Sequence, residues 1–382
     1  MRNKKKNVNL LPKRWYIYHL LTNIYNMKYL TLEKSLEAWN KLQPLSEKDI
    51  QRLSRRFTVD FNYNSNHIEG NTLTYGQTEL LLLFGKVIGE ADAKDVHDMA
   101  ASNVSLKMMT EETTTQQPLT QNFIRTLHKT LLREDYKVYK NLPGGLQTSY
   151  TVHAGQYKTR PNSVITRYGD RFEYASPEET PALMTDLVDW YNQTEKEGKL
   201  SPVELAALFH YRYIRIHPFE DGNGRIARLL VNYILARHNY PMIVVRSRLK
   251  HEYLEALHKA DLIVGSVPTN GAHAQINEIK PFMLYFKKLV AQEIYGNVCF
   301  ITEHDQDTWW YDGEKIKFRS PNFSHILNLM QTEPVLTMAE IQRKTNISMS
   351  AVQKLIEQLL EKHYVEKGMQ EGSWRVFITP SI

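Results

Sequence analysis

The sequence predicts a mainly α-helical protein, with one β-hairpin ahead of a glycine-rich motif and a separate small unit at the C-terminal end. Three observations predict this fold class. Apolar residues recur at helical spacing through most of residues 30–300. Residues 162–175 contain the one clear hairpin pattern in the middle of the chain, and residues 321–382 change to short helices followed by two strands.

We divide the 382 residues into four regions: an N-terminal helical region (1–105), a helical core (106–299), a linker (300–320) and a C-terminal unit (321–382). The 42% hydrophobic and 24% charged residues are ordinary for a globular protein. No apolar run reaches membrane-spanning length, and the single Cys299 excludes an intrachain disulfide and a CxxC metal site. We therefore expect a cytoplasmic protein without membrane partners.

In the N-terminal region we expect helices within residues 30–53, 78–84 and 92–109. Residues 64–71 read Asn-Ser-Asn-His-Ile-Glu-Gly-Asn. Ser65 or Asn66 can cap a short helix there, and Gly70 can end it. By itself this stretch predicts only a capped helical turn.

In the core, helices are expected at 122–132, 182–197, 203–216, 249–261 and 281–295. The hairpin strands are expected at 162–167 and 172–175, with Gly169-Asp170 as the turn. They lie ahead of the glycine-rich motif in sequence.

That motif, residues 216–230, reads Ile-His-Pro-Phe-Glu-Asp-Gly-Asn-Gly-Arg-Ile-Ala-Arg-Leu-Leu. Apolar residues approach it and leave it at helical spacing. Pro218 stops the first helix just after His217, because its ring clashes with the preceding turn. Gly222-Asn223-Gly224 is a turn that begins the next helix, with Arg225 and Arg228 in its first turns.

These residue types suit phosphate chemistry. A helix start binds anions through free N–H groups, and Gly222 and Gly224 allow close backbone approach. Arg225 and Arg228 share a helix face and can fork onto phosphate oxygens. Asp221 is a hard ligand for Mg²⁺, and His217 can take a proton from a hydroxyl. The combination indicates phosphoryl or nucleotidyl transfer.

The motif resembles the signature of the Fic (Fido-fold) family, His-x-Phe-x-(Asp/Glu)-Gly-Asn-Gly-Arg-x-x-Arg. Every fixed position is filled, from His217 to Arg228. Family members mostly transfer AMP from ATP to a Ser, Thr or Tyr hydroxyl of a protein. The resemblance implies that His217 is the base and that Asp221 holds Mg²⁺. It assigns the phosphates to Gly222, Asn223, Gly224, Arg225 and Arg228.

Three further expectations follow from the resemblance. Ser65-x-x-x-Glu69-Gly70 is similar to the family's inhibitory motif, in which Glu69 would pair with Arg228 and occupy the fork meant for the γ-phosphate. The hairpin is similar to the family's flap, which docks a target backbone as an added strand; its docking residues would be Ser163, Val164, Ile165 and Thr166. Nucleoside contacts are expected from Asn232, Tyr253 and Asp261.

The C-terminal unit has helices near 324–332, 338–345 and 348–362, then strands at 363–367 and 374–379. This order resembles a winged helix. Its third helix carries Gln353, Lys354 and Gln358 but also Glu357 and Glu361, so its charge is nearly balanced. We expect protein–protein or homodimer contact from this unit rather than DNA binding, which stays open.

The sequence therefore predicts a protein adenylyltransferase that uses ATP and Mg²⁺, modifies a hydroxyl of an unidentified protein or of itself, and is autoinhibited by Glu69. Three alternatives stay open. The chain is a nucleotide-sensing DNA-binding regulator, it removes AMP from modified proteins at the same site, or it transfers another phosphate-containing group.

Overall fold

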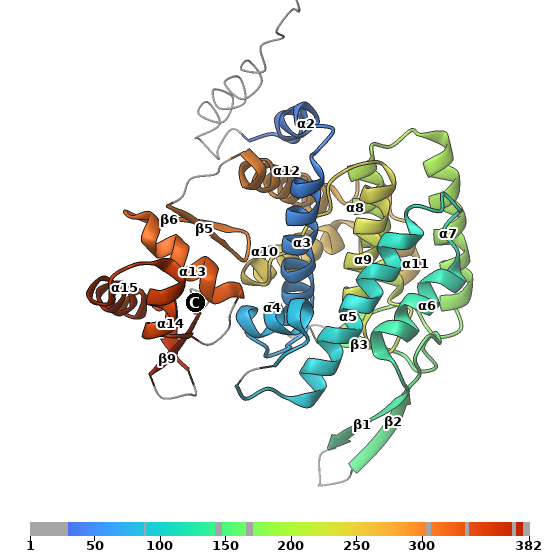
Figure 1. Cartoon of the computed structure of the whole chain (residues 1–382). Coiled ribbons are helices and arrows are strands. Elements are labelled where there is room, and N and C mark those ends of the chain that lie inside the picture. Colours follow the sequence, from blue (N-terminus) through green and yellow to red (C-terminus); the bar gives the residue numbers. More distant parts are fainter. Residues whose placement is uncertain are drawn as a thin grey trace, which may run out of the picture.

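The computed structural model describes residues 30–87, 89–141, 147–165, 171–302, 307–332, 336–368 and 372–376. Within these ranges the chain is mainly helical, and its short strands form small antiparallel sheets (Figure 1). The predicted fold class is confirmed. None of the helices described is both long and apolar enough to cross a membrane.

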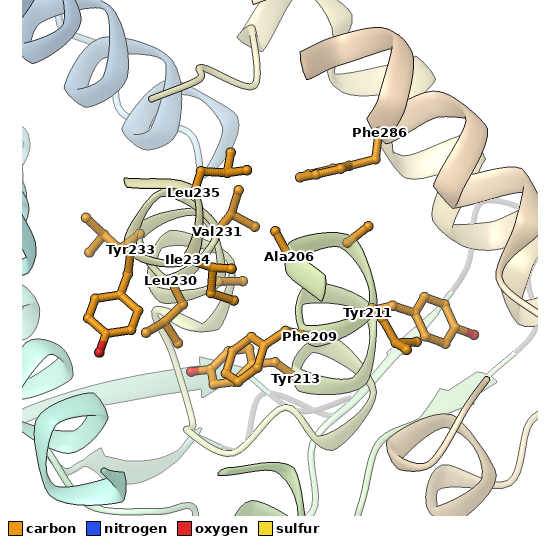
Figure 2. Close-up of a cluster of buried hydrophobic side chains, with 14 of the residues drawn as sticks. Ala206, Phe209, Tyr211, Tyr213, Leu230, Val231, Tyr233, Ile234, Leu235 and Phe286 are labelled. Carbon is orange, nitrogen blue, oxygen red and sulfur yellow. The ribbon is translucent and has the colours of Figure 1, made fainter. Parts of the chain in front are cut away.

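Two buried helices form the centre of the larger body, α8 (Pro202–Ile216) and α9 (Asn223–Arg237). Figure 2 shows their apolar side chains meeting, with Phe286 of α12 (Lys280–Thr302) beside them. Because most side chains of both helices are buried, the loop that joins them is held firmly at both ends. That loop carries the glycine-rich motif.

Local sequence explains how α8 begins and ends. The Ser201 hydroxyl and the Glu204 carboxylate form a reciprocal capping box at its start, where Pro202 fits because its missing N–H is not needed. The helix ends at His217, which has left-handed backbone angles (φ 52°, ψ 60°), just before Pro218.

Other helices of the larger body surround this pair. They are α5 (Ala93–Glu112), α6 (Gln121–Leu132), α7 (Thr180–Glu197), α10 (Lys250–Val264), α11 (Pro268–Ala272) and α12. The predicted core helices are therefore confirmed, with α12 extending further than expected.

The N-terminal region forms α2 (Leu32–Lys41), α3 (Glu47–Ile68) and α4 (Tyr75–Phe84). The predicted cap at Ser65 or Asn66 is wrong, because both residues lie in the last turn of the 22-residue α3. Asn62, Asn64 and Asn66 each donate a side-chain hydrogen bond of 2.8 Å to a carbonyl four residues earlier. This polar run therefore continues the helix instead of breaking it. Gly70 does follow the helix end, with φ 97°.

Two hairpins precede the motif. The predicted one has described strands β3 (Ser163–Ile165) and β4 (Arg171–Glu173), with Ser163 opposite Glu173. Thr166 and the Gly169-Asp170 turn lie outside the described residues. A longer hairpin, β1 (Tyr136–Asn141) and β2 (Gln147–Val152), was not predicted, and it projects from the body in Figure 1.

The C-terminal unit has the predicted winged-helix arrangement. Its elements are α13 (Pro321–Thr332), β7 (Leu336–Thr337), α14 (Met338–Thr345), α15 (Met349–Glu361), β8 (Val365–Lys367) and β9 (Ser373–Val376). The hairpin of β5 (Thr308–Tyr311) and β6 (Glu314–Lys317) precedes them. The strand order β7–β9–β8 includes the short β7, which was not expected. The rest of the predicted last strand, beyond residue 376, is outside the described residues.

Residues 300–320, which we expected to connect the core to the C-terminal unit through an aromatic anchor, contain the β5–β6 hairpin. The β5–β6 hairpin buries Trp309 and Tyr311 in the apolar core of the C-terminal unit. The same cluster includes Val59 and Tyr63 of α3 and Tyr75 of α4. The hairpin thus packs the C-terminal unit against the helix that carries Ser65 and ends at Glu69.

Candidate active site

A cleft of about 530 Å³ opens where the motif loop faces the end of α3 and one side of α10. His217 and the turn at residues 222–224 both line it, so the two halves of the motif meet in one space. Arg228 and Glu69 also line it. The cleft is large enough for a nucleotide-sized ligand.

The His217 ring stacks against Tyr174, which follows β4, with 3.9 Å between ring centroids and 12° between planes. Burial lowers the pKa of His217 to about 3, and the nearby Lys158 charge adds to this shift, while Glu69 and Asp221 oppose it. The imidazole is therefore neutral near pH 7 and can accept a proton. Tyr174 was not singled out in the sequence.

The glycine-rich turn is closed by hydrogen bonds. Gly222, at φ 76°, is the N-cap of α9. The Asn223 amide donates to the Phe219 carbonyl at 2.7 Å and accepts from the Phe219 N–H at 2.9 Å. The Asn223 side chain thus holds the loop, and the backbone N–H groups at the start of α9 can bind a phosphate.

His128 of α6 supports this turn from behind. Its Nε2 lies 3.0 Å from the Asp221 carbonyl oxygen, its Nδ1 accepts from the Gly155 N–H at 2.9 Å, and its ring stacks on Phe219. Burial lowers the pKa of His128 to about 4, so the ring is neutral. It is a buried residue that supports the turn.

The guanidinium of Arg228 is hydrogen-bonded to residues at the end of α3. Its Nε donates to the Ser65 hydroxyl at 3.0 Å, and its Nη2 donates to the Ser65 carbonyl at 2.8 Å and to the Glu69 carboxylate at 2.7 Å. Burial opposes ionisation of Glu69, but the charge and hydrogen bond of Arg228 outweigh it and lower the pKa of Glu69. The ion pair predicted from the sequence is present. Gly224 makes room for it, because a Cβ there would collide with the carboxylate.

Asp221 lines the cleft beside the turn, and its side chain is 47% exposed. One carboxylate oxygen accepts from the Tyr136 hydroxyl at 2.6 Å and lies 3.4 Å from Arg225 Nη2. Burial raises the pKa of Asp221, but the Arg225 charge and these hydrogen bonds lower it overall. Arg225 thus contacts Asp221 and, unlike Arg228, is not among the cleft-lining residues.

In the part of the chain that the structure describes, no three His, Cys, Asp or Glu side chains cluster as a metal site. A hard cation at Asp221 would take its other ligands from phosphate oxygens and water. Mg²⁺ is commonly bound in this way, through one or two carboxylates and substrate phosphates. The ionised, accessible carboxylate of Asp221 fits such an ion.

The expected nucleoside contacts fall into two groups. Tyr253 and Asp261 line the cleft, where the Tyr253 hydroxyl bonds His210 at 2.9 Å and Asp261 accepts from Tyr211 at 2.8 Å. Asn232 is wrong as a nucleoside contact. Its amide donates to the carbonyls of Arg228 and Ile243 and accepts from the Ile243 N–H, so it is fully used within the core and lies away from the cleft.

Two family models match the chain. One, described as Fic/DOC family, matches residues 118–235, and one described as winged helix-turn-helix DNA-binding matches residues 324–366. The structure is similar to that of a Fic domain containing signaling protein from Bacteroides thetaiotaomicron, with 50% identity and a TM-score of 0.65. The similarity covers 70% of this chain and 95% of that chain.

Curated relatives are more distant. Protein adenylyltransferase fic-1 of Caenorhabditis elegans is 29% identical over 240 residues, which cover 63% of this chain and 41% of the relative. Protein adenylyltransferase Fic of Nematostella vectensis is 30% identical over 232 residues, which cover 60% of this chain and 50% of the relative. The chain thus spans half or less of the length of these relatives.

Proposed function

The chain belongs to the Fic/DOC family, and from this premise we propose that it is a protein adenylyltransferase that transfers AMP from ATP to a hydroxyl side chain of a protein. The curated relatives, which carry that activity in their names, support the reaction class. The carrying observation is that a neutral His217 and the N-terminal turn of α9 line one cleft.

In the proposed reaction the triphosphate lies on the α9 turn. The N–H groups of Asn223 and Gly224 and the positive end of the helix dipole stabilise its charge, while the Gly222 N–H donates to the Asp221 carboxylate at 2.7 Å. The hydroxyl oxygen of the target attacks the α-phosphorus and forms a new P–O bond. The bond from that phosphorus to the bridging oxygen breaks, and pyrophosphate leaves. The hydroxyl proton passes to the neutral imidazole of His217.

A Mg²⁺ ion held by Asp221 would neutralise phosphate charge when bound. The chain's own contribution is to keep that carboxylate ionised and oriented. Tyr136 and Arg225 do so through the hydrogen bond and the charge described above.

We propose that Glu69 inhibits this reaction. Arg228 is 3% exposed and lines the cleft, and its Nε and Nη2 donate to Ser65 and Glu69. An Arg fork that holds a carboxylate cannot hold a phosphate with the same N–H groups. ATP would then bind with its γ-phosphate displaced and its α-phosphorus away from the line of attack.

The target is proposed to dock along β3, next to His217. Within the described residues β3 pairs with β4 alone, so the other edge of β3 has no neighbouring strand and can add one from another chain. Ser163, Val164 and Ile165 would supply the backbone groups. This docking mode uses main-chain hydrogen bonds, so it suits a protein substrate but does not identify which protein is modified.

Labelled ATP tests the proposal. With ATP labelled at the α-phosphate, Glu69→Gly protein should become labelled, and the Glu69→Gly/His217→Ala double variant should not. ATP labelled at the γ-phosphate should give no label on either protein. Label from the γ-position would instead indicate transfer of a phosphate. No label from either position would overturn the proposed reaction.

A second candidate function is DNA binding by the C-terminal unit, favoured by its match to the winged helix-turn-helix model. The solvent face of α15 carries Gln353 and Lys354 but also Glu357, to which Gln353 donates at 3.2 Å. This mixed charge suits a protein surface better than phosphates. A gel-shift assay at two salt concentrations separates the functions, since specific DNA binding should persist where non-specific binding is lost.

A further inference from the structure

Lys158 is a buried lysine in the segment between β2 and β3, and only 3% of it is exposed. Its ammonium donates to the Asn162 side-chain oxygen at 2.8 Å, the Ile216 carbonyl at 3.0 Å and the His217 carbonyl at 2.9 Å. Burial lowers the pKa of Lys158 to about 7, while the three acceptors match the three hydrogens of the protonated form. A buried ammonium is costly unless it is fully bonded, and the three acceptors meet this need when Lys158 is protonated.

The same segment makes other bonds to the motif loop. The Lys158 N–H donates to the Pro218 carbonyl at 2.9 Å, and the Thr159 hydroxyl donates to Glu220 at 3.1 Å. The Asn162 amide donates to the Phe219 carbonyl at 3.1 Å. Residues 158–162 are therefore bonded to the loop from Ile216 to Glu220, on both sides of the proposed base.

This bonding matters because His217 has an unusual backbone. Its φ of 52° lies in the left-handed region, which costs a non-glycine residue free energy and persists only where its surroundings impose it. Lys158 bonds the carbonyls before and after that residue's Cα. Lys158 itself does not line the cleft, so any effect on the reaction acts through His217.

Asn162 connects this arrangement to the flap. It accepts from Lys158 and immediately precedes Ser163, the first residue of β3. The hydrogen bonds of Lys158 and Asn162 therefore hold both β3, where a target strand would pair, and the backbone of His217.

We propose that Lys158 is a positioning residue for the transfer, which fixes the His217 backbone relative to β3 and so sets the distance from the imidazole to the hydroxyl that attacks. This inference rests on the proposed function. It goes beyond it because neither the signature nor the inhibitory motif includes Lys158 or Asn162.

The test compares rate with nucleotide binding in the Glu69→Gly background. Lys158→Met keeps the length of the side chain and removes its donors. A small displacement of the base can cost about 100-fold in rate. We expect the maximal self-labelling rate to fall by about 10- to 100-fold, while the ATP concentration for half-maximal rate changes less than about twofold. Lys137→Met, an exposed lysine on β1, is the matched control and should change neither.

Asn162→Ala should also slow labelling, so it keeps the inference testable if Lys158→Met folds poorly. If Lys158→Met does fold, the Lys158→Met/Asn162→Ala double variant should label little more slowly than Lys158→Met alone, because the effects of residues that act as a unit are not additive. An unchanged rate in Lys158→Met would overturn the inference. So would a parallel loss of ATP binding, which would mean that the whole loop had collapsed.

If the Glu69→Gly parent does not label at all, the proposed function fails. The positioning role of Lys158 is then tested by NMR, which needs no enzymatic activity. The His217 signal in an NMR spectrum of protein with isotope-labelled histidine is assigned by its loss in His217→Ala. Lys158→Met should displace that signal and Lys137→Met should not. An unmoved signal in Lys158→Met would contradict the positioning role.

Discussion

The Glu69 carboxylate accepts a hydrogen bond of 2.7 Å from the Nη2 of Arg228, a residue 159 positions later in the chain. Ser65, one turn earlier in α3, receives two more bonds from the same guanidinium. Freeing Arg228 therefore requires the last turn of α3 to move or to lose its acceptors. We therefore propose that the end of α3 controls the transfer reaction.

Tyr136 should affect metal dependence. Its hydroxyl donates to the Asp221 carboxylate at 2.6 Å and so helps to hold that carboxylate in place. Removing a hydrogen bond to a metal ligand typically weakens metal affinity by about 10- to 100-fold. In the Glu69→Gly background, Tyr136→Phe should raise the Mg²⁺ concentration needed for half-maximal labelling by about tenfold.

The control for this variant lies on the same strand. Tyr139 is 63% exposed, so Tyr139→Phe should leave the Mg²⁺ dependence unchanged. Equal Mg²⁺ dependence of Tyr136→Phe and Tyr139→Phe would contradict the claim that Tyr136 orients Asp221 for the metal ion.

Arg246 should be the main polar residue that stabilises the contact between the larger body and the C-terminal unit with its β5–β6 hairpin. It is 4% exposed and bonds Asp60 of α3 at 2.8 Å, Glu293 of α12 at 2.9 Å and Asp312 of the β5–β6 turn at 3.1 Å. Arg246→Met leaves these acids without their shared partner. We expect the free energy of unfolding to fall by about 3–5 kcal/mol, measured by urea denaturation.

Arg248 provides the comparison. It bonds Asp312 and Glu314 but its side chain is 34% exposed, so Arg248→Met should cost about 0–1 kcal/mol. If Arg246→Met costs as little as Arg248→Met, the network does not support the interface.

The free energy of unfolding should fall as the pH is lowered below about 6, because the protein buries neutral histidines. Burial lowers the pKa of His128 to about 4, from its ordinary value of about 6.5. Between these values the unfolded chain binds a proton that the folded chain does not, so stability rises with pH there and is lost as pH falls. One such group contributes a slope of about 1.4 kcal/mol per pH unit.

His128→Gln removes that slope. The variant should be less stable than the wild type near neutral pH, and the difference should narrow by about 1.4 kcal/mol per pH unit below about pH 6. Urea denaturation at several pH values measures it. A difference that stays constant with pH would mean that folding does not lower the pKa of His128.

Much of the site was predictable because the motif combines several different residue types at fixed spacing. His217, Asp221, the glycines and Arg228 lie in one loop and helix start, so local sequence determines their relative positions. The pairing of Glu69 with Arg228 was predictable only through the family resemblance, since the two residues are far apart in sequence.

Other features had no local signal. The strands of the β1–β2 hairpin are largely exposed or partly exposed on both faces, so their apolar residues do not alternate clearly, and Tyr136 was missed with them. Lys158 is an ordinary lysine in sequence, and only the fold brings it under His217. Asn232 was misassigned because its amide is used by the backbone of Arg228 and Ile243. No local signal indicates that Trp309 and Tyr311 pack with Tyr63 and Tyr75 of the N-terminal helices.

The most direct measurement is the intact mass of purified protein after incubation with ATP and Mg²⁺. Glu69→Gly should gain the mass of one or more AMP groups, whereas the wild type and the Glu69→Gly/His217→Ala protein should stay largely unmodified. Glu255→Gln, which removes another cleft carboxylate that does not contact Arg228, should behave like the wild type. An unmodified Glu69→Gly protein, or equal modification of Glu69→Gly and wild type, would contradict the claim that a nucleotidyl transfer site is held inactive by Glu69.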